Sequence, residues 1–131
     1  MASRGHVIDE VPDFPLIVTD EIQKLNKTKD VKDTFLQLGI WPDIYRVRES
    51  RKVRAGRGKG RGRRIKQAVG PLIVINENKG IVKAARNLPG VDIVAVDSLN
   101  VELLSPGAHP GRLTMWTNSA LERLDNLFGE R

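Results

Sequence analysis

The sequence predicts an α/β protein: a Rossmann-like layered fold with a mostly parallel sheet, plus one extended basic segment rich in arginine and glycine. Short apolar runs alternate along the chain with helix-forming segments, which is typical of βαβ units. These runs are apolar at nearly every position, as expected of parallel strands that are buried on both faces. The chain has 131 residues, 40% of them hydrophobic, and is therefore predicted to form a single globular domain over residues 1–131.

The first part of the chain is predicted to hold one strand and two helices. The strand is the run FPLIVT at residues 14–19, and Asp20 follows it as the N-cap of a short helix over residues 21–25. Residues 28–38 are expected to form an amphipathic helix, because apolar side chains recur at spacings of four and three, at Val31, Phe35 and Leu38.

A third helix, with Ile44 and Val47 on one face, is predicted to have Asp43 as its N-cap. After the basic segment, the chain alternates three strands with three helices. The strands are the runs PLIVIN, VDIVAV and LTMWT, at residues 71–76, 91–96 and 113–117. The helices are expected at residues 80–88, from Asp97 or Ser98 to Leu104, and at residues 119–128.

Residues 51–66, RKVRAGRGKGRGRRIK, form a separate cationic segment without an acidic residue. Its nine basic residues are Arg51, Lys52, Arg54, Arg57, Lys59, Arg61, Arg63, Arg64 and Lys66. Without them, 13 of the 22 basic residues remain against 16 acidic ones, so the rest of a chain of net charge +6 carries −3. Alternating glycines oppose helix formation, so the segment is predicted to be extended or irregular, with a reach of roughly 50 Å.

The composition of this segment indicates a clamp for the phosphates of RNA. Glycine lets the backbone approach a phosphate chain, and the planar fork of arginine matches phosphate oxygens. All six aromatic residues lie outside the segment, whereas proteins that bind single strands stack bases on aromatic side chains. We therefore expect recognition of folded RNA by its shape and backbone, with the segment ordering as it binds.

Other interpretations of the segment are weaker. Gly58-Lys59 is followed by Gly60 rather than by Ser or Thr, so the P-loop pattern is not met, and arginines replace the third glycine of the dinucleotide fingerprint. A membrane-surface patch would need an amphipathic helix with apolar anchors. A protein–protein interaction module that carries a solvated basic loop stays open as the alternative.

The remaining residues do not indicate an enzyme, a cofactor or a metal site. The chain has no cysteine, which excludes disulfides and thiol chemistry, and its two histidines are not at metal-ligand spacing. The serines lack the context of a catalytic nucleophile. Arg112 follows the loop SPGAHPG, where its guanidinium could reach a phosphate, although an ordinary exposed arginine is an equally good interpretation.

Four segments resemble the archaeal and eukaryotic form of the family of the fourth large-subunit ribosomal protein. They are KVRAGRGKGRGRR at residues 52–64, ARNLPGV at 85–91, LSPGAHPGRLTMWT at 104–117 and SALERLDNLFG at 119–129. The resemblance implies a Rossmann-like domain of the cytoplasmic ribosome. Its partners would be large-subunit ribosomal RNA and neighbouring ribosomal proteins, without membrane, cofactor, small-molecule substrate or catalytic residue. By position, it also implies that the nine basic residues of the segment and Arg112 contact RNA.

Members of this family are about twice as long as this chain. Their N-terminal half supplies a first strand and helix and a loop that reaches toward the peptide exit tunnel. The chain is therefore expected to correspond to the C-terminal portion of the family domain, and tunnel lining is not expected of it. A sheet edge and an apolar face that lack these neighbours should be exposed and should recruit other chains.

Overall fold

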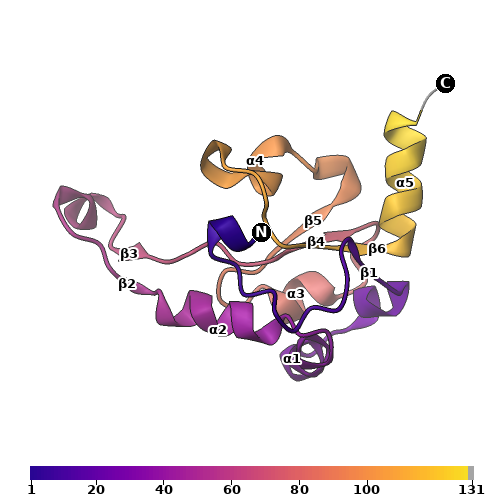
Figure 1. Ribbon diagram of the computed structural model, residues 1–131, viewed down its shortest axis with the longest axis horizontal. Helices are drawn as coiled ribbons and strands as arrows, with labels where there is room; N and C mark the ends of the chain where they lie inside the picture. The colour runs from indigo at the N-terminus through magenta and orange to yellow at the C-terminus, as the bar shows by residue number, and fades with distance from the viewer. Residues whose placement is uncertain (130–131) are drawn as a thin grey trace.

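The computed structural model describes residues 1–129 and shows a central parallel sheet with helices on both faces (Figure 1). Its four strands, in their order across the sheet, are β1 (Leu16–Val18), β6 (Thr114–Thr117), β4 (Leu72–Ile75) and β5 (Asp92–Ala95). All three pairings are parallel, and Leu72 of β4 lies opposite both Thr114 and Asp92. The predicted layered α/β fold with a mostly parallel sheet is confirmed.

Strand β4 is buried on both faces, which explains why its sequence LIVI is apolar throughout. Its four side chains are at most 1% exposed. Because side chains alternate between the two faces of a strand, Ile73 and Ile75 pack into one apolar core, while Leu72 and Val74 pack into another on the opposite face.

The larger core lies beneath the sheet in Figure 1, between the sheet and the helices α1 (Thr28–Gln37), α2 (Trp41–Glu49) and α3 (Ile81–Ala85). The predicted helical periodicity is confirmed in α1, because Val31 and Phe35 are fully buried. The smaller core lies on the other face, where α4 (Val101–Leu104) and α5 (Asn118–Phe128) contribute Leu103, Leu104, Ala120 and Leu124.

The described part of the chain also contains five short 3-10 helices. They are η1 (Ala2–Arg4), η2 (Asp20–Lys24), η3 (Arg57–Arg61), η4 (Val96–Ser98) and η5 (Pro106–Ala108). Within residues 1–129, no helix is long and apolar enough to cross a membrane.

Three predicted helix starts are wrong, namely those at Asp20, at Asp97 or Ser98, and at Asp43. Asp20 does not cap its own helix; its Oδ1 accepts hydrogen bonds from the backbone N–H of Ser119, at 3.1 Å, and from the Ser119 hydroxyl, at 2.6 Å. It therefore supplies an acceptor to the first turn of α5, far away in the sequence. The helix predicted to run from Asp97 or Ser98 to Leu104 is two helices, η4 and α4, and Asn100 caps the second by accepting from the backbone of Leu103.

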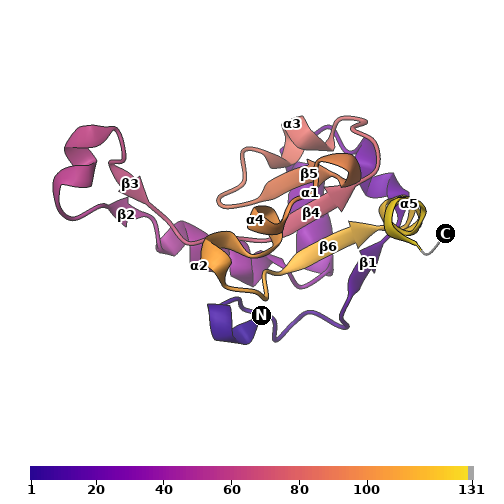
Figure 2. The same ribbon diagram turned by 90° about the horizontal axis from the view of Figure 1, so that it is seen from above.

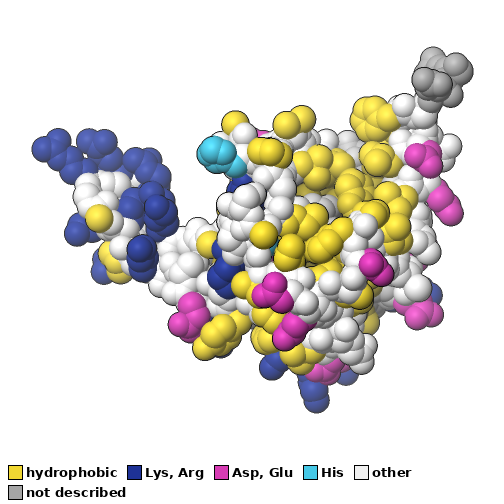
Figure 3. All heavy atoms as spheres, in the orientation of Figure 1, with side chains coloured by type: hydrophobic (Ala, Val, Ile, Leu, Met, Phe, Trp, Pro, Cys, Tyr) yellow, Lys and Arg dark blue, Asp and Glu magenta, His cyan; other side chains and the backbone are white. Residues whose placement is uncertain are grey.

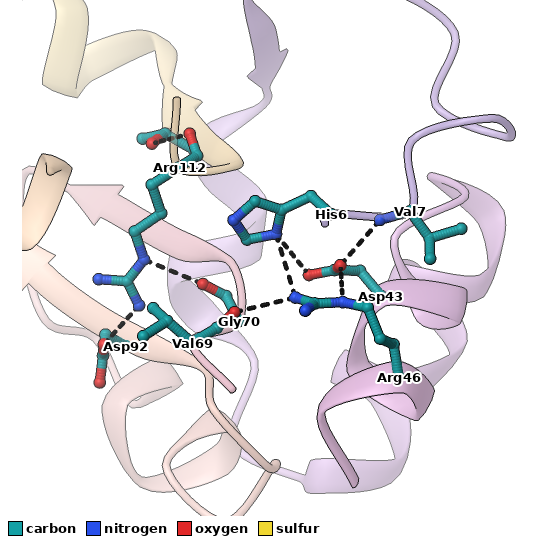
Figure 4. A network of polar contacts seen from close by, with 9 residues as sticks. His6, Val7, Asp43, Arg46, Val69, Gly70, Asp92 and Arg112 are labelled. Atoms are coloured by element: carbon teal, nitrogen blue, oxygen red, sulfur yellow. Dashed lines mark hydrogen bonds and ion pairs between the residues drawn. The ribbon is translucent and has the colours of Figure 1, made fainter. Parts of the chain in front are cut away.

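Asp43 is not an N-cap either, but a fully buried carboxylate inside the first turn of α2. Its Oδ2 accepts a hydrogen bond from Nδ1 of His6 at 2.9 Å (Figure 4). Its Oδ1 accepts from the backbone N–H of Val7 at 3.0 Å and from Nε of Arg46 at 2.9 Å. This one side chain therefore fastens the N-terminal segment to α2.

The contacts of Asp43 give the fold a dependence on acid pH. Burial raises the pKa of the Asp43 carboxyl, but the hydrogen bonds from His6, Arg46 and Val7 together lower it more, so the pKa lies below its ordinary value of 3.8. A carboxylate with a lowered pKa in the folded chain stabilises the fold above its unfolded pKa. That contribution is lost as the pH falls through about 4 toward the folded pKa.

Asp43→Asn should reduce the free energy of unfolding at pH 7 by about 2–4 kcal/mol. The amide keeps one acceptor oxygen, but its NH2 group then faces either the donor of His6 or the donors of Val7 and Arg46. Below a pH of about 4, the variant should lose less further stability than the wild type, because it lacks the titrating group. Urea unfolding across this pH range measures both effects. Asp33→Asn, at an exposed position of α1, is the control and should match the wild type. Wild-type stability and acid sensitivity in Asp43→Asn would contradict this role.

The edge strand β1 has an apolar and partly uncovered outer side. Within the described chain it pairs only with β6, and Ile17 is 45% exposed. A groove of about 460 Å³ runs beside the strand and is lined in part by Ile17, Ile22, Leu25 and Leu38. Figure 3 shows hydrophobic side chains gathered over the face between α4 and α5. The described chain therefore has a sheet edge with an exposed apolar side chain at β1, and the absence of neighbouring elements as its cause stays a prediction.

We predict that the isolated chain self-associates through this edge, because unpaired strand edges and large apolar patches recruit other chains. Sedimentation velocity at increasing concentration should show species larger than the monomer. Ile17→Lys should shift the distribution toward monomer, because a charged side chain blocks edge pairing. Leu36→Lys, at an exposed apolar position of α1 that does not line the groove, should not. A wild-type chain that stays monomeric at all concentrations would refute the prediction.

Candidate nucleic-acid interface

The basic segment forms an antiparallel hairpin, which we call the arm (residues 51–66). Strand β2 (Lys52–Val53) pairs with β3 (Ile65–Lys66), and η3 lies at the tip. The arm projects from the domain at the end opposite α5 (Figures 1 and 2). The segment is extended in its two strands and mostly irregular elsewhere, as predicted, but it does not stretch over its full reach, because the chain reverses direction between Gly56 and Gly62. Both have positive φ values, +81° and +78°, which glycine adopts without strain.

Cationic side chains dominate the arm surface. Eight of the nine basic residues are exposed, and Arg54 is the ninth, partly buried one. Figure 3 shows these side chains crowded together on the arm. None of the ion pairs found within residues 1–129 involves an arm residue. The positive charge is therefore not neutralised within the described chain and is available to a polyanion.

The β2–β3 pair, which we call the neck of the arm, has two different faces. Val53 and Ile65 lie opposite each other in the β2–β3 pair and are 53% and 43% exposed. Lys52 and Lys66 form the adjacent pair, whose side chains point to the other face because side chains alternate along a strand. An apolar contact surface thus accompanies the charged one.

Three consecutive residues, 68–70, form what we call the root of the arm, and each is held by a different group of the domain. The backbone N–H of Ala68 donates to Oγ of Ser50 at 2.8 Å. The Val69 carbonyl accepts from Nη2 of Arg46 at 2.9 Å. The Gly70 carbonyl accepts from Nε of Arg112, also at 2.9 Å (Figure 4). These contacts fix where the returning leg of the arm enters β4.

Arg112 lies in the domain and not on the arm surface. It is 4% exposed as a residue. Beyond Gly70, it donates from Nη1 to the Leu103 carbonyl at 2.9 Å and from Nη2 to the Asp92 carboxylate. These contacts and its burial leave the guanidinium covered, so the phosphate contact of Arg112 stays a prediction that its position does not favour. Leu103 and Asp92 lie 9 and 20 residues before Arg112. These separations match no helical or strand spacing, so the sequence did not reveal the two contacts.

Sequence reasoning missed two supporting arginines, Arg4 and Arg46. Arg46 joins Asp43 to the root of the arm. Arg4 donates from Nη1 to the carbonyls of Pro106 and His109 and so ties η1 to the loop that precedes Arg112. The acceptors on the root of the arm and on the loop are carbonyls remote in sequence, and carbonyl groups leave no trace in a pattern of side chains.

The arm leaves the sheet at the amino ends of the strands, because its root runs directly into Leu72 of β4. Parallel α/β sheets bind nucleotides and substrates at the opposite edge, beyond the carboxyl ends of their strands. Among residues 1–129, no group of three or more His, Cys, Asp or Glu side chains is placed to hold a metal ion. The arm is therefore the main candidate site of the described chain, and its chemistry is that of an anion-binding surface.

Comparison with known proteins places the chain in a family. Residues 3–127 match the sequence model of the Ribosomal protein L4/L1 family. Among the similar proteins is the large ribosomal subunit protein uL4 of Methanopyrus kandleri, 51% identical over 127 residues, which are 97% of this chain and 49% of that protein. The uL4 protein of Pyrobaculum aerophilum is 48% identical over 129 residues, or 98% of this chain and 46% of that protein.

The similarity extends to eukaryotes. The uL4 protein of Drosophila melanogaster is 50% identical over 127 residues, which are 97% of this chain and 32% of that protein. The chain thus spans half or less of the length of the curated relatives that it matches, and it matches them over almost its own full length. On this evidence, the chain belongs to the ribosomal protein L4/L1 family.

Proposed function

We propose that the chain is a structural constituent of the large ribosomal subunit that binds ribosomal RNA through the arm and supports subunit assembly and translation. The observation that carries this proposal is the projecting hairpin with eight exposed basic side chains and no acidic one. A polyanion that meets this surface gains many charge-assisted contacts and releases its counterions.

Folded RNA fits the arm better than single-stranded RNA does. The arm contains no aromatic residue on which bases could stack. Its side chains can instead contact phosphate and ribose groups, which is how proteins recognise structured RNA largely by shape. The contact set consists of the eight exposed residues, namely Arg51, Lys52, Arg57, Lys59, Arg61, Arg63, Arg64 and Lys66, with Arg54 and Arg112 in supporting roles.

The cellular setting follows from the family. Relatives that carry the name of a large-subunit protein support a place in the cytoplasmic ribosome, beside ribosomal RNA and neighbouring ribosomal proteins. The proposed role needs no catalytic residue and no cofactor, because neutralisation of phosphates is a binding function.

A protein–protein interaction module is the competing function, and two apolar surfaces favour it. These are the Val53–Ile65 pair on the neck and the uncovered side of β1. A pull-down from a ribosome-containing extract, with and without residues 51–66, separates the two functions. If the full chain recovers ribosomal RNA and the chain without residues 51–66 does not, the proposed function is supported. If both chains recover protein partners and neither recovers RNA, the alternative is supported.

Binding to large-subunit ribosomal RNA should depend strongly on salt. If six of the eight exposed basic residues contact phosphates, affinity should fall by roughly four to five decades per tenfold rise in salt. Replacing Arg57, Lys59, Arg61 and Arg63 together by alanine should reduce this slope by roughly 3. The melting temperature should stay unchanged, because these side chains are exposed. Filter binding at several salt concentrations, with thermal unfolding in parallel, tests both expectations.

The matched control removes the same amount of charge from the body of the domain. Lys24, Lys27, Lys29 and Lys83 are exposed there, and their combined replacement by alanine should leave the salt slope near that of the wild type. Equal effects of the two quadruple variants would mean that total charge, and not the arm, determines RNA binding.

Arg112→Ala should destabilise the fold and leave the salt slope unchanged. Removal of the guanidinium leaves the carbonyls of Gly70 and Leu103 without their side-chain donor. The lost ion pair with Asp92 adds little to the destabilisation, because the Asp92 side chain is half exposed. We expect a decrease of about 2–4 kcal/mol in the free energy of unfolding. Arg123→Ala, which removes an exposed pair with Asp97, should cost less than about 1 kcal/mol. A stable Arg112→Ala variant with a reduced salt slope would instead identify Arg112 as a phosphate contact.

A further inference from the structure

Arg54 differs from the other basic residues of the arm. It is the partly buried one of the nine, and its contacts lie within the arm itself. Its Nε donates to the carbonyl of Arg63 at 3.0 Å, and its backbone N–H donates to the carbonyl of Arg64 at 2.8 Å. The side chain therefore bridges the two legs of the arm beyond the short β2–β3 pair.

The tip above this bridge is closed by a further backbone contact, from the N–H of Arg63 to the carbonyl of Gly58 at 3.1 Å. Gly58 also leaves room for the Arg54 side chain, because a Cβ atom at position 58 would lie 2.9 Å from Cδ of Arg54. Gly60 has no such neighbour, and nothing would lie within 4 Å of an added Cβ. The two glycines of η3 thus have different surroundings although the sequence repeats.

We propose that Arg54 is a positioning residue, which closes the tip so that the exposed cations are held in a fixed arrangement before RNA binds. This inference rests on the proposed function. Like charges crowded on a short loop repel one another, so an open tip would spread over many conformations. A bridge from Arg54 to Arg63 restricts that spread, and preorganisation of this kind reduces the entropy lost on binding.

A fixed arrangement of cations suits one class of RNA. Folded RNA presents phosphates at fixed positions, so it gains from a tip whose charges are already placed. A flexible homopolymer adapts its phosphates to any arrangement and gains little. The inference therefore predicts an effect of the bridge that is specific to folded RNA, which differs from the sequence-based expectation of a segment that orders only on binding.

Gly58→Ala and Gly60→Ala form the central comparison. Both variants add one methyl group to η3 and change no charge, but the first displaces Arg54. Gly58→Ala should weaken binding to folded large-subunit ribosomal RNA by about 3- to 10-fold, the scale of one lost hydrogen bond, at an unchanged salt slope. Gly60→Ala should stay within about twofold of the wild type. Neither should change the affinity for polyuridine.

The route through Arg54 is tested by a double-variant cycle. In an Arg54→Ala background, the bridge is already absent, so Gly58→Ala should have no larger effect than Gly60→Ala. Hydrogen exchange at the Arg63 amide of the free protein gives an independent readout. It should accelerate in Gly58→Ala and Arg54→Ala but not in Gly60→Ala, while the melting temperature of the domain stays constant.

The outcomes separate the inference from the function on which it rests. Equal effects of Gly58→Ala and Gly60→Ala, or an equal loss of affinity for polyuridine, would overturn the positioning role of Arg54. In that case the quadruple alanine variant of the tip would still lose RNA binding. Wild-type binding by the quadruple variant would instead overturn the proposed function itself.

Discussion

The arrangement of the N-terminal segment and α2 beside the arm depends on the contacts of one buried carboxylate, that of Asp43. A buried charge is tolerated only when it is paired and hydrogen-bonded, and Asp43 meets this condition with donors from His6, Val7 and Arg46. Arg46 in turn binds the Val69 carbonyl. Asp43 and Arg46 together therefore link the N-terminal segment, α2 and the root of the arm.

The positive charge of the arm explains why the arm lies outside the domain and why polar contacts hold its root. Burying unpaired cations in an apolar core is prohibitively unfavourable, so a segment with nine basic residues has to leave the sheet. Its two legs then have few apolar contacts of their own, and Val53 and Ile65 remain exposed. Polar anchors at residues 68–70 replace the missing core. Arg112 supplies one of them, which is why its guanidinium faces the Gly70 carbonyl inside the domain.

Periodicity and apolar runs predicted every strand of the main sheet and most of its helices, because these signals are local. The N-cap roles wrongly predicted for Asp20 and Asp43 came from an equally local rule, that a carboxylate just before a helix caps that helix. Asp20 and Asp43 do accept backbone N–H groups, but from Ser119 and Val7, which only the folded chain brings near. The hairpin was missed for a related reason. Alternating glycine correctly disfavoured a long helix, but the positive φ values at Gly56 and Gly62 that reverse the chain have no separate signature in a repeat of glycines.

The same repeat carries different physical roles at successive positions. Gly56 and Gly62 allow the chain to turn, Gly58 gives room to Arg54, and an added Cβ at Gly60 would contact nothing. The basic residues divide in a similar way, because eight present their charge to solvent while Arg54 holds the legs together. An account of the arm that counts only its charge treats all these positions as equivalent. The contacts within the tip make them distinguishable, and they give a conformational role to residues that composition alone would assign to electrostatics.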